Sequence, residues 1–287
     1  MADSTPPIAQ AVRNSNFEPI IFGFDVQAYG KDSTTVIDVT PLYTTDVTML
    51  GLPSFMKTQY QIRRLDPART FMEGIRSFPK NIETRVVLTY DAGAAPSNAS
   101  GGAITVLMNH SMLLLPEKPM MGRLADDRVS YFGVQQTDYG REEDRVIRRR
   151  FISRWRLEPK DTAAFLRGEL VEPVKQIVYY IDPATPEKWV PYLIAGVNDW
   201  NAAFEAAGFK NAIVGKRAPT PQEDPEFSVD DARYAVIRYL ASDIENASGP
   251  HVPDPRSGEI LESHIQWYHN VMNLLRNWYL IQTAAIN

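Results

Sequence analysis

The chain has 287 residues, 44% of them apolar and 23% charged, which is the composition of a globular protein with about two domains. Its formal net charge of −5 argues against nucleic acid or an anionic membrane as partner, because those surfaces select basic proteins. Cysteine is absent, which excludes disulfides, thiolate metal sites and cysteine nucleophiles. No apolar run approaches the roughly 20 residues of a membrane span.

The first part of the chain is predicted to be rich in β-strands. Apolar and polar residues alternate over residues 22–28, as in a half-buried strand, and a turn separates this run from a second one at 35–39. Residues 84–90 and 104–116 form another pair of apolar runs. Two further runs, over 128–140 and 148–159, continue the pattern. We therefore expect a β-rich domain over residues 1–172.

The pattern changes after residue 172. Five apolar β-formers at 177–181 predict a buried strand, and a helix is expected to follow, with Thr185 as its N-cap, Pro186 in its first turn and Gly208 at its end. Two more strands are predicted near residues 211–215 and 234–242.

A tight turn at 254–258, a strand at 259–268 and an apolar-faced helix at 271–285 complete the chain. This order is typical of a mixed sheet. The predicted fold class is α+β, in which the β-rich domain of residues 1–172 precedes an α/β mixed-sheet domain over residues 173–287.

Three of the four histidines, His251, His264 and His269, lie in the segment GPHVPDPRSGEILESHIQWYHN. Two histidines bind one metal ion from a helix when they are four residues apart, whereas His264 and His269 are five apart and would diverge on a helix or a strand. Histidines that are hydrogen-bonded at a turn and a helix start are therefore the favoured interpretation. We assign no metal ligand and no catalytic residue.

Other chemistries lack their sequence signals. The chain has no G-x-S-x-G, no phosphate-binding P-loop and no G-x-G-x-x-G motif. The basic run at 145–156 is interpreted as a solvated strand face, because the chain as a whole is acidic. The acidic pair Asp126 and Asp127 precedes Arg128, and a loop that holds this arginine is favoured over carboxylate catalysis.

Long stretches of the chain resemble a family of large zinc-dependent metalloproteases of Gram-negative bacteria, related to the metzincins. The resemblance rests on SMLLLPEKPMMGRLADDRVSYF, RWRLEPKD, RGELVEP, YIDPATPEKWVPYLIAGVNDWNAAFEAAGFKNAI, DARYAVIRY and ASGPHVPDPRSGEILESHIQWYHNVMNLLRNWY. It implies an accessory β domain followed by the start of a metzincin-like peptidase domain. It also implies export and a zinc cofactor, held by an H-E-x-x-H-x-x-G-x-x-H motif downstream of residue 287. No cofactor is expected for this chain itself, which would be inactive alone.

The resemblance further implies a place for a polypeptide substrate. In metzincin-like folds the edge strand ahead of the zinc helix pairs antiparallel with extended peptide. That strand would here be residues 259–268, behind a rim at 248–258. The candidate substrate-binding residues are Gly249, Pro250, His251, Glu259, Ile260, Leu261, Glu262 and His264. A plain edge strand capped by its turn is an equally good interpretation.

Two functions are therefore carried forward. The first is a fragment of a zinc metalloendopeptidase, and the second is a non-enzymatic module that binds polypeptide or glycan on a degenerate peptidase scaffold. If the last helix exposes its apolar face, self-association of the chain is also expected.

Overall fold

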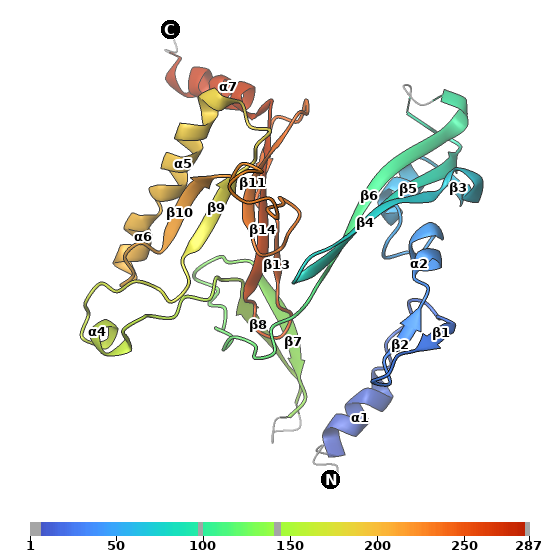
Figure 1. Cartoon of the computed structure of the whole chain (residues 1–287), viewed down its shortest axis with the longest axis horizontal. Coiled ribbons are helices and arrows are strands. Elements are labelled where there is room, and N and C mark those ends of the chain that lie inside the picture. The colour runs from blue at the N-terminus through green and yellow to red at the C-terminus, as the bar shows by residue number, and fades with distance from the viewer. Residues whose placement is uncertain (1–6, 97–99, 141–144, 285–287) are drawn as a thin grey trace. The chain divides into compact units, whose positions relative to one another are not determined.

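The computed structural model describes residues 7–96, 100–140 and 145–284. The chain forms two compact units, Met1–Leu114 and Leu115–Asn287, which we call unit 1 and unit 2. Helices and several sheets are both present, so the chain has the predicted α+β fold (Figure 1).

Unit 1 is rich in β-strands. Its elements are α1 (Pro7–Ser15), β1 (Val26–Tyr29), β2 (Thr35–Ile37), α2 (Thr40–Thr44), α3 (Ser54–Gln59), β3 (Ile62–Leu65), β4 (Phe71–Ser77), β5 (Asn81–Ala92) and β6 (Ala103–Leu113). The long strand β5 pairs antiparallel with β6 and also with β3 and β4, which follow each other along the strand. Val86, Leu88 and Tyr90 of β5 are buried against Tyr43 and Leu52.

The predicted strand pairs of unit 1 are confirmed, with one difference. Strand β5 contains the apolar run at 84–90, β6 contains the run at 104–116 as far as Leu113, and β1 pairs with β2 as a hairpin. The expected half-buried face is only partly present: Phe22 and Phe24 are half-buried but lie before the strand, whereas every residue of β1 and β2 is exposed. Alternation predicts a strand, but burial also needs a second layer, and the hairpin has none in the described part of unit 1.

Unit 2 begins with a two-stranded sheet and continues into an α/β layer. Its elements are β7 (Gly133–Asp138), β8 (Ile147–Ile152), α4 (Thr162–Leu166), β9 (Ile177–Ile181), a 3-10 turn (Glu187–Trp189), α5 (Val190–Asn198), α6 (Asn201–Ala206), β10 (Ile213–Arg217), β11 (Ala235–Leu240), β12 (Ala247–Ser248), β13 (His251–Pro253), β14 (Ile260–Tyr268) and α7 (Val271–Thr283).

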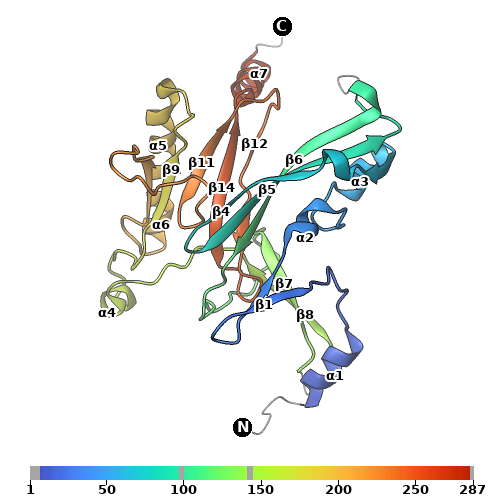
Figure 2. The ribbon, with the colours of Figure 1, turned by 45° about the vertical axis from the view of Figure 1, so that its right-hand side comes forward.

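The main sheet of unit 2 is mixed, as the sequence predicted. Strands β10, β9, β11 and β14 run parallel in that order, and the short strands β12 and β13 pair antiparallel with the outer side of β14. Helices α5 and α6 lie along one face of this sheet (Figures 1 and 2). Val190 and Val197 of α5 pack there on Ile177, Tyr179 and Ile181 of β9. This packing fixes the parallel strands as one rigid layer.

The residues that directly follow β8 are hydrogen-bonded to the start of β14, which explains why residues 115–172 belong to unit 2. Arg154 donates its backbone N–H to the Gly258 carbonyl at 2.9 Å and accepts the N–H of Ile260 at 2.9 Å. These bonds join the small β7–β8 sheet to the start of β14. Compactness therefore groups residues 115–172 with the α/β layer. The domain boundary predicted at residue 172 from the change in residue pattern stays a prediction.

The expected position of residues 259–268 is wrong. They form a strand, but β14 lies inside the sheet, between β11 and the short pair β12 and β13. After β11 the chain passes to the outer edge of the sheet and forms β12 and β13 there. It then turns at 254–258 and returns as β14, which lies between β11 and the pair β12 and β13. The edge strand is therefore the segment that the sequence assigned to the rim.

The helix predicted from Thr185 is broken into three pieces. Thr185 does not cap it: no side-chain bond caps the 3-10 turn, and the buried Thr185 hydroxyl has no hydrogen-bond partner among the described residues. Pro191 lies in the first turn of α5, where its missing N–H is tolerated. Gly208 follows α6 with φ +92°, as expected for a glycine that ends a helix.

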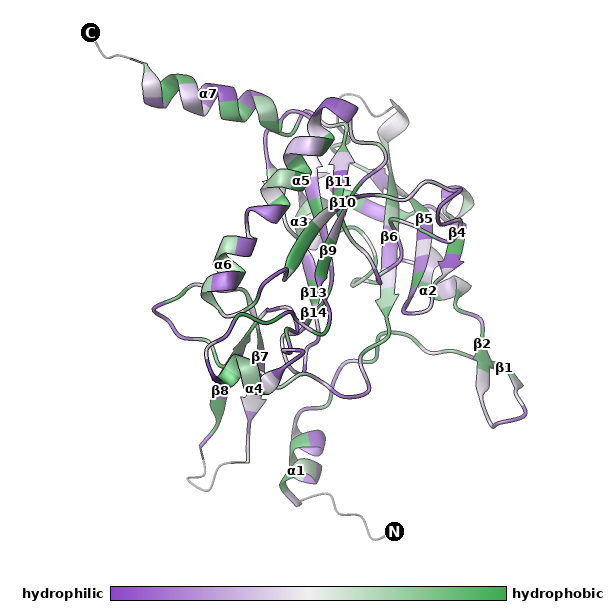
Figure 3. Cartoon of the chain, turned by 60° about the vertical axis from the view of Figure 1, so that its left-hand side comes forward, coloured by the Kyte–Doolittle hydropathy of each residue, from purple (hydrophilic) through white to green (hydrophobic). Residues whose placement is uncertain are grey.

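Helix α7 extends beyond the end of β14 (Figure 3). Val271 is its buried residue, whereas Leu275, Trp278, Tyr279, Leu280 and Ile281 are exposed. The predicted exposed apolar surface of this helix is therefore present. Within the described ranges of the chain, no helix combines the length and apolar character needed to cross a bilayer.

Candidate functional site

The outer strand of the main sheet, formed by β12 and β13, is the first candidate site. His251 pairs with Ser263 and Val252 with Glu262 of β14. Among the described residues neither β12 nor β13 has a second strand beside it. Because alternate main-chain groups of a strand point away from its partner, this edge offers C=O groups and the N–H groups of its non-proline residues to another strand, whereas Pro250 and Pro253 have no N–H to donate.

Two contacts fix the entry to β13. The Ser263 hydroxyl donates to the Pro250 carbonyl at 3.3 Å, and the Tyr179 hydroxyl donates to Ser263 Oγ at 3.0 Å. Ser263 is buried. The outer strand is therefore held to the sheet by a side-chain network as well as by its pairing with β14.

The turn after β13 is closed by a buried aspartate. Asp254 is fully buried and accepts hydrogen bonds from the backbone N, Nε and Nη2 of Arg256 at 2.8, 3.0 and 2.7 Å. The Arg256 guanidinium lowers the pKa of Asp254, although burial opposes this shift. Gly258 then adopts φ +76°, which an L side chain disfavours. The predicted tight turn is confirmed, and it fixes the direction in which β13 leads into β14.

The same Asp-x-Arg geometry occurs twice more. Asp126 accepts bonds from the backbone N and guanidinium of Arg128, and Asp231 does so from Arg233. The pKa of Asp126 falls to about 2 because of the Arg128 hydrogen bond. The interpretation of the Asp126 segment as a loop that holds an arginine is thus confirmed. We infer from this recurrence that Asp254 and Arg256 are a local structural pair.

The predicted substrate-binding residues fall into two groups. Gly249, Pro250 and His251 lie at the outer edge, and Gly249 and Pro250 are exposed. The other five belong to β14 or directly precede it, inside the sheet: Glu259, Ile260, Leu261, Glu262 and His264. Residues 264–268 of β14 pair with β11, and β12 pairs with the same part of β14 from the other side. Residues 260–263 pair with β13, and Ile260 also donates its N–H to the Arg154 carbonyl. The first group lies on the strand with the open edge and is therefore better placed to contact an added polypeptide.

The three histidines of the segment have three different environments. The His251 ring lies beside Phe132, with centroids 5.7 Å apart. His264 Nε2 lies 3.1 Å from a Glu262 oxygen, and His269 Nδ1 contacts the Tyr239 hydroxyl. Within the described ranges, no group of three His, Cys, Asp or Glu residues could hold a metal ion. The residues described here therefore do not fit a zinc site.

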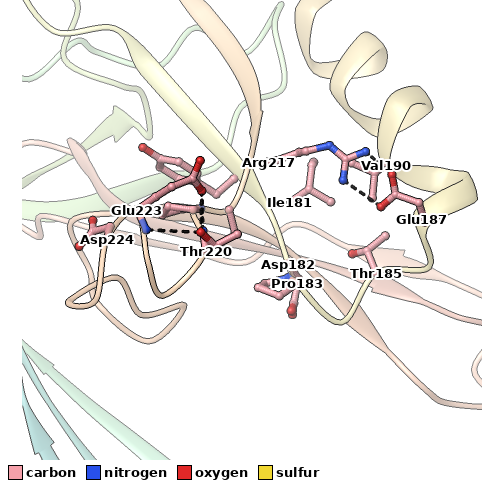
Figure 4. Close-up of a pocket in the computed structure, with 13 residues that line it drawn as sticks. Ile181, Asp182, Pro183, Thr185, Glu187, Val190, Arg217, Thr220, Glu223 and Asp224 are labelled. Atoms are coloured by element: carbon pink, nitrogen blue, oxygen red, sulfur yellow. Dashed lines mark hydrogen bonds and ion pairs between the residues drawn. The ribbon is translucent and has the colours of Figure 1, made fainter.

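A second candidate site is a pocket of about 670 Å³ at the carboxyl ends of β9 and β10 (Figure 4). Ligands of open α/β sheets bind at this end of the strands. Its lining comprises Tyr180, Ile181, Asp182, Pro183, Thr185, Glu187, Val190, Arg217, Ala218, Pro219, Thr220, Glu223 and Asp224.

Several charged groups at the pocket are already paired: Asp182 forms an ion pair with Arg238, which lies outside the lining. Arg217 and Glu187 form a two-pronged ion pair, and Glu223 accepts from the backbone N–H of Thr220 at 2.8 Å. The Arg217 hydrogen bond lowers the pKa of Glu187, and the Thr220 bond lowers that of Glu223. With four acidic side chains and one arginine in its lining, the pocket favours a cation or a hydrogen-bond donor over an anion.

Sequence reasoning did not single out Phe132. The run SYFG reads as part of an ordinary strand, and only the structure places this ring beside His251 of the outer strand. Phe132 directly precedes Gly133, the first residue of β7. An aromatic residue at such a position is a weak signal of a binding site, because the sequence does not distinguish a buried ring from an exposed one.

The fold and the outer strand define an α+β protein whose α/β unit has an open antiparallel edge. The chain belongs to the family described as Domain of unknown function (DUF5117), whose model matches residues 1–160. The match covers unit 1 and the β7–β8 part of unit 2, and it ends before β9. Neither the curated proteins nor the solved structures contain a match to the chain.

Proposed function

We propose that this chain is part of a zinc-dependent metalloendopeptidase, in which unit 2 holds a polypeptide substrate in an extended conformation along the outer strand β12–β13. The observation that carries this proposal is the sheet itself: four parallel strands are followed outward by a short antiparallel strand with an open edge. The sequence resemblance to metzincin-like peptidases supports the same function and suggests an exported protein.

The step assigned to this chain is substrate alignment. An extended peptide that adds to β13 would form main-chain hydrogen bonds, which are independent of sequence, while its alternate side chains would meet the two faces of the sheet. The buried Asp254 and its partner Arg256 hold the end of β13 in place. Because the described residues do not fit a zinc site, we assign them no part in the hydrolytic step.

Binding without hydrolysis is the second candidate function. The open edge would serve a non-enzymatic polypeptide-binding module equally well, because strand addition needs only free main-chain groups. An H-E-x-x-H motif within about one helix downstream of residue 287 in the same reading frame would favour the peptidase. A stop codon there would favour the binding module.

Strand addition is tested with an acetylated and amidated heptapeptide of sequence TVTFTVT. A matched peptide carries N-methyl groups on alternate amides and cannot donate the same hydrogen bonds. We expect the first peptide to protect main-chain amides of residues 247–249, 251 and 252 from hydrogen exchange, Pro250 having no amide hydrogen. The methylated peptide should bind at least about 10-fold more weakly, since several hydrogen bonds of about 1 kcal/mol each are lost. Equal binding of both peptides, or protection elsewhere only, would refute strand addition.

A further inference from the structure

Phe132 presents a large apolar ring to solvent directly beside the outer strand. Its side chain is 78% exposed, and its ring lies 5.7 Å from that of His251 with an angle of 58° between the planes. Burial of a phenylalanine side chain is among the larger favourable contributions that one residue makes to association. An exposed ring at this position is therefore available to a partner that covers it.

The backbone that carries this ring is fixed. The Phe132 carbonyl accepts from the Ser153 N–H at 2.7 Å, and the Tyr131 carbonyl accepts from Arg150 Nη2 at 2.7 Å. Gly133 begins β7 so close to β8 that an added Cβ would lie 2.4 Å from the Phe151 carbonyl oxygen. Because the main chain is held on both sides of the ring, little backbone freedom is lost when a ligand binds there.

The main chain of β13 and the Phe132 ring together indicate that the ligand is a polypeptide strand. A strand added to β13 would place one of its side chains directly opposite His251, at about 5 Å between Cβ atoms. On that face the side chain would meet the Phe132 ring. The neighbouring Val252 is 40% exposed and would face the next residue of the added strand on the other side of the sheet. A small apolar molecule would cover the ring but leave the main-chain groups of β13 unpaired.

We propose that Phe132 forms an apolar subsite of the outer strand, and that polypeptides held there carry an aromatic or large aliphatic side chain at the position opposite His251. This inference rests on the proposed function and adds a substrate preference to it. Phe132 is a specificity-determining residue that contacts the substrate side chain. It takes no part in bond cleavage.

The test compares fluorescein-labelled TVTFTVT with TVTATVT, in which alanine replaces the phenylalanine. We expect the phenylalanine peptide to bind the whole chain about 5-fold more tightly, and the difference to disappear in Phe132→Ala. Phe132→Leu should keep most of it, because leucine also offers an apolar surface. The matched control is Phe55→Ala, which removes a 70% exposed ring from α3 in unit 1 and should leave both affinities unchanged.

The possible results separate the subsite from strand addition. If both peptides bind the unaltered chain equally well and protect the amides of β13, the subsite is refuted while strand addition stands. If neither peptide binds, the proposed function fails and the subsite with it. If protection of residues 247–252 rises with protein concentration in the absence of peptide, a second copy of the chain occupies the edge, which overturns the inference. Persistence of the 5-fold preference in Phe132→Ala would also overturn it.

Discussion

Arg156 and Glu259 form a bidentate ion pair that joins the segment after β8 to the start of β14. Nε and Nη2 of Arg156 lie 2.8 and 2.5 Å from the two carboxylate oxygens, and Nη2 also donates to the Lys118 carbonyl at 3.0 Å. Glu259 is buried. The hydrogen bonds to Glu259 raise the pKa of Arg156, so the guanidinium stays charged over the whole working range of pH.

Removal of Arg156 should destabilise unit 2. Arg156→Ala leaves the buried Glu259 carboxylate without its partner, and we expect a loss of about 2 to 3 kcal/mol in the free energy of unfolding, measured by urea denaturation. The control is Arg217→Ala, which removes an equally two-pronged but exposed pair with Glu187 and should change stability by less than about 1 kcal/mol. Similar losses in both variants would contradict the role given to burial.

Gly258 is expected to be the glycine of unit 2 least tolerant of alanine. A Cβ there would lie 2.4 Å from the Ile152 carbonyl oxygen, and φ is +76°. The control is Gly168, which has φ +83° but open space around it. Gly168→Ala should cost about 1 kcal/mol from backbone conformation alone. Gly258→Ala should cost at least about 3 kcal/mol, because overpacking adds to that amount. Thermal unfolding of both variants measures the difference, and equal shifts would refute the close contact.

His110 should make the stability of unit 1 depend on pH. It packs on the Tyr43 ring, and its Nε2 is buried without a partner among the described residues. Burial lowers its pKa from the ordinary 6.5. The unfolded chain therefore binds a proton near pH 6.5 that the folded chain does not. The resulting stability is complete above that pH and is lost as the pH falls toward the lower folded-state pKa.

The measurement for His110 is urea denaturation between pH 8 and pH 5, followed by fluorescence and compared with His110→Phe. We expect the variant to gain stability relative to the unaltered chain as the pH falls below about 6.5. A constant difference between the two proteins over this range would show that His110 titrates alike in the folded and unfolded states.

Helix α7 should promote self-association. Trp278, Leu280 and Ile281 are 53%, 62% and 76% exposed, and contiguous apolar surface of this kind favours contact between molecules. Light scattering over a concentration series should show dimers or larger species. The double variant Trp278→Glu with Ile281→Lys should shift them to monomers, whereas Tyr192→Lys, at a 72% exposed residue of α5, should not. A monomer at all concentrations would contradict the prediction.

Zinc titration tests the environments of the histidines. By calorimetry we expect no stoichiometric uptake of Zn²⁺ by this chain, since His251, His264 and His269 contact different partners. Tight binding that His264→Ala abolishes would contradict this expectation. So would peptide cleavage by the purified chain that a chelator stops and zinc restores.

Residue patterns predicted most elements of this protein. The apolar runs at 177–181 and 84–90 predicted β9 and β5, and the DPRSG sequence predicted the turn that Asp254 and Gly258 form. These features depend on neighbours within a few residues, so local chemistry determines them. Gly249 to His251 were singled out as rim residues next to a strand, and their assignment to substrate binding stays a prediction.

The tertiary structure alone decided which strand is the edge and what lies beside it. Periodicity indicates which side chains share one face of a strand, but it does not tell which strands lie on either side of β14, because pairing partners are chosen over long sequence separations. The same holds for Phe132, which reaches His251 only because the segment after β8 pairs with the start of β14. Sequence therefore determined the elements, and long-range packing determined the site.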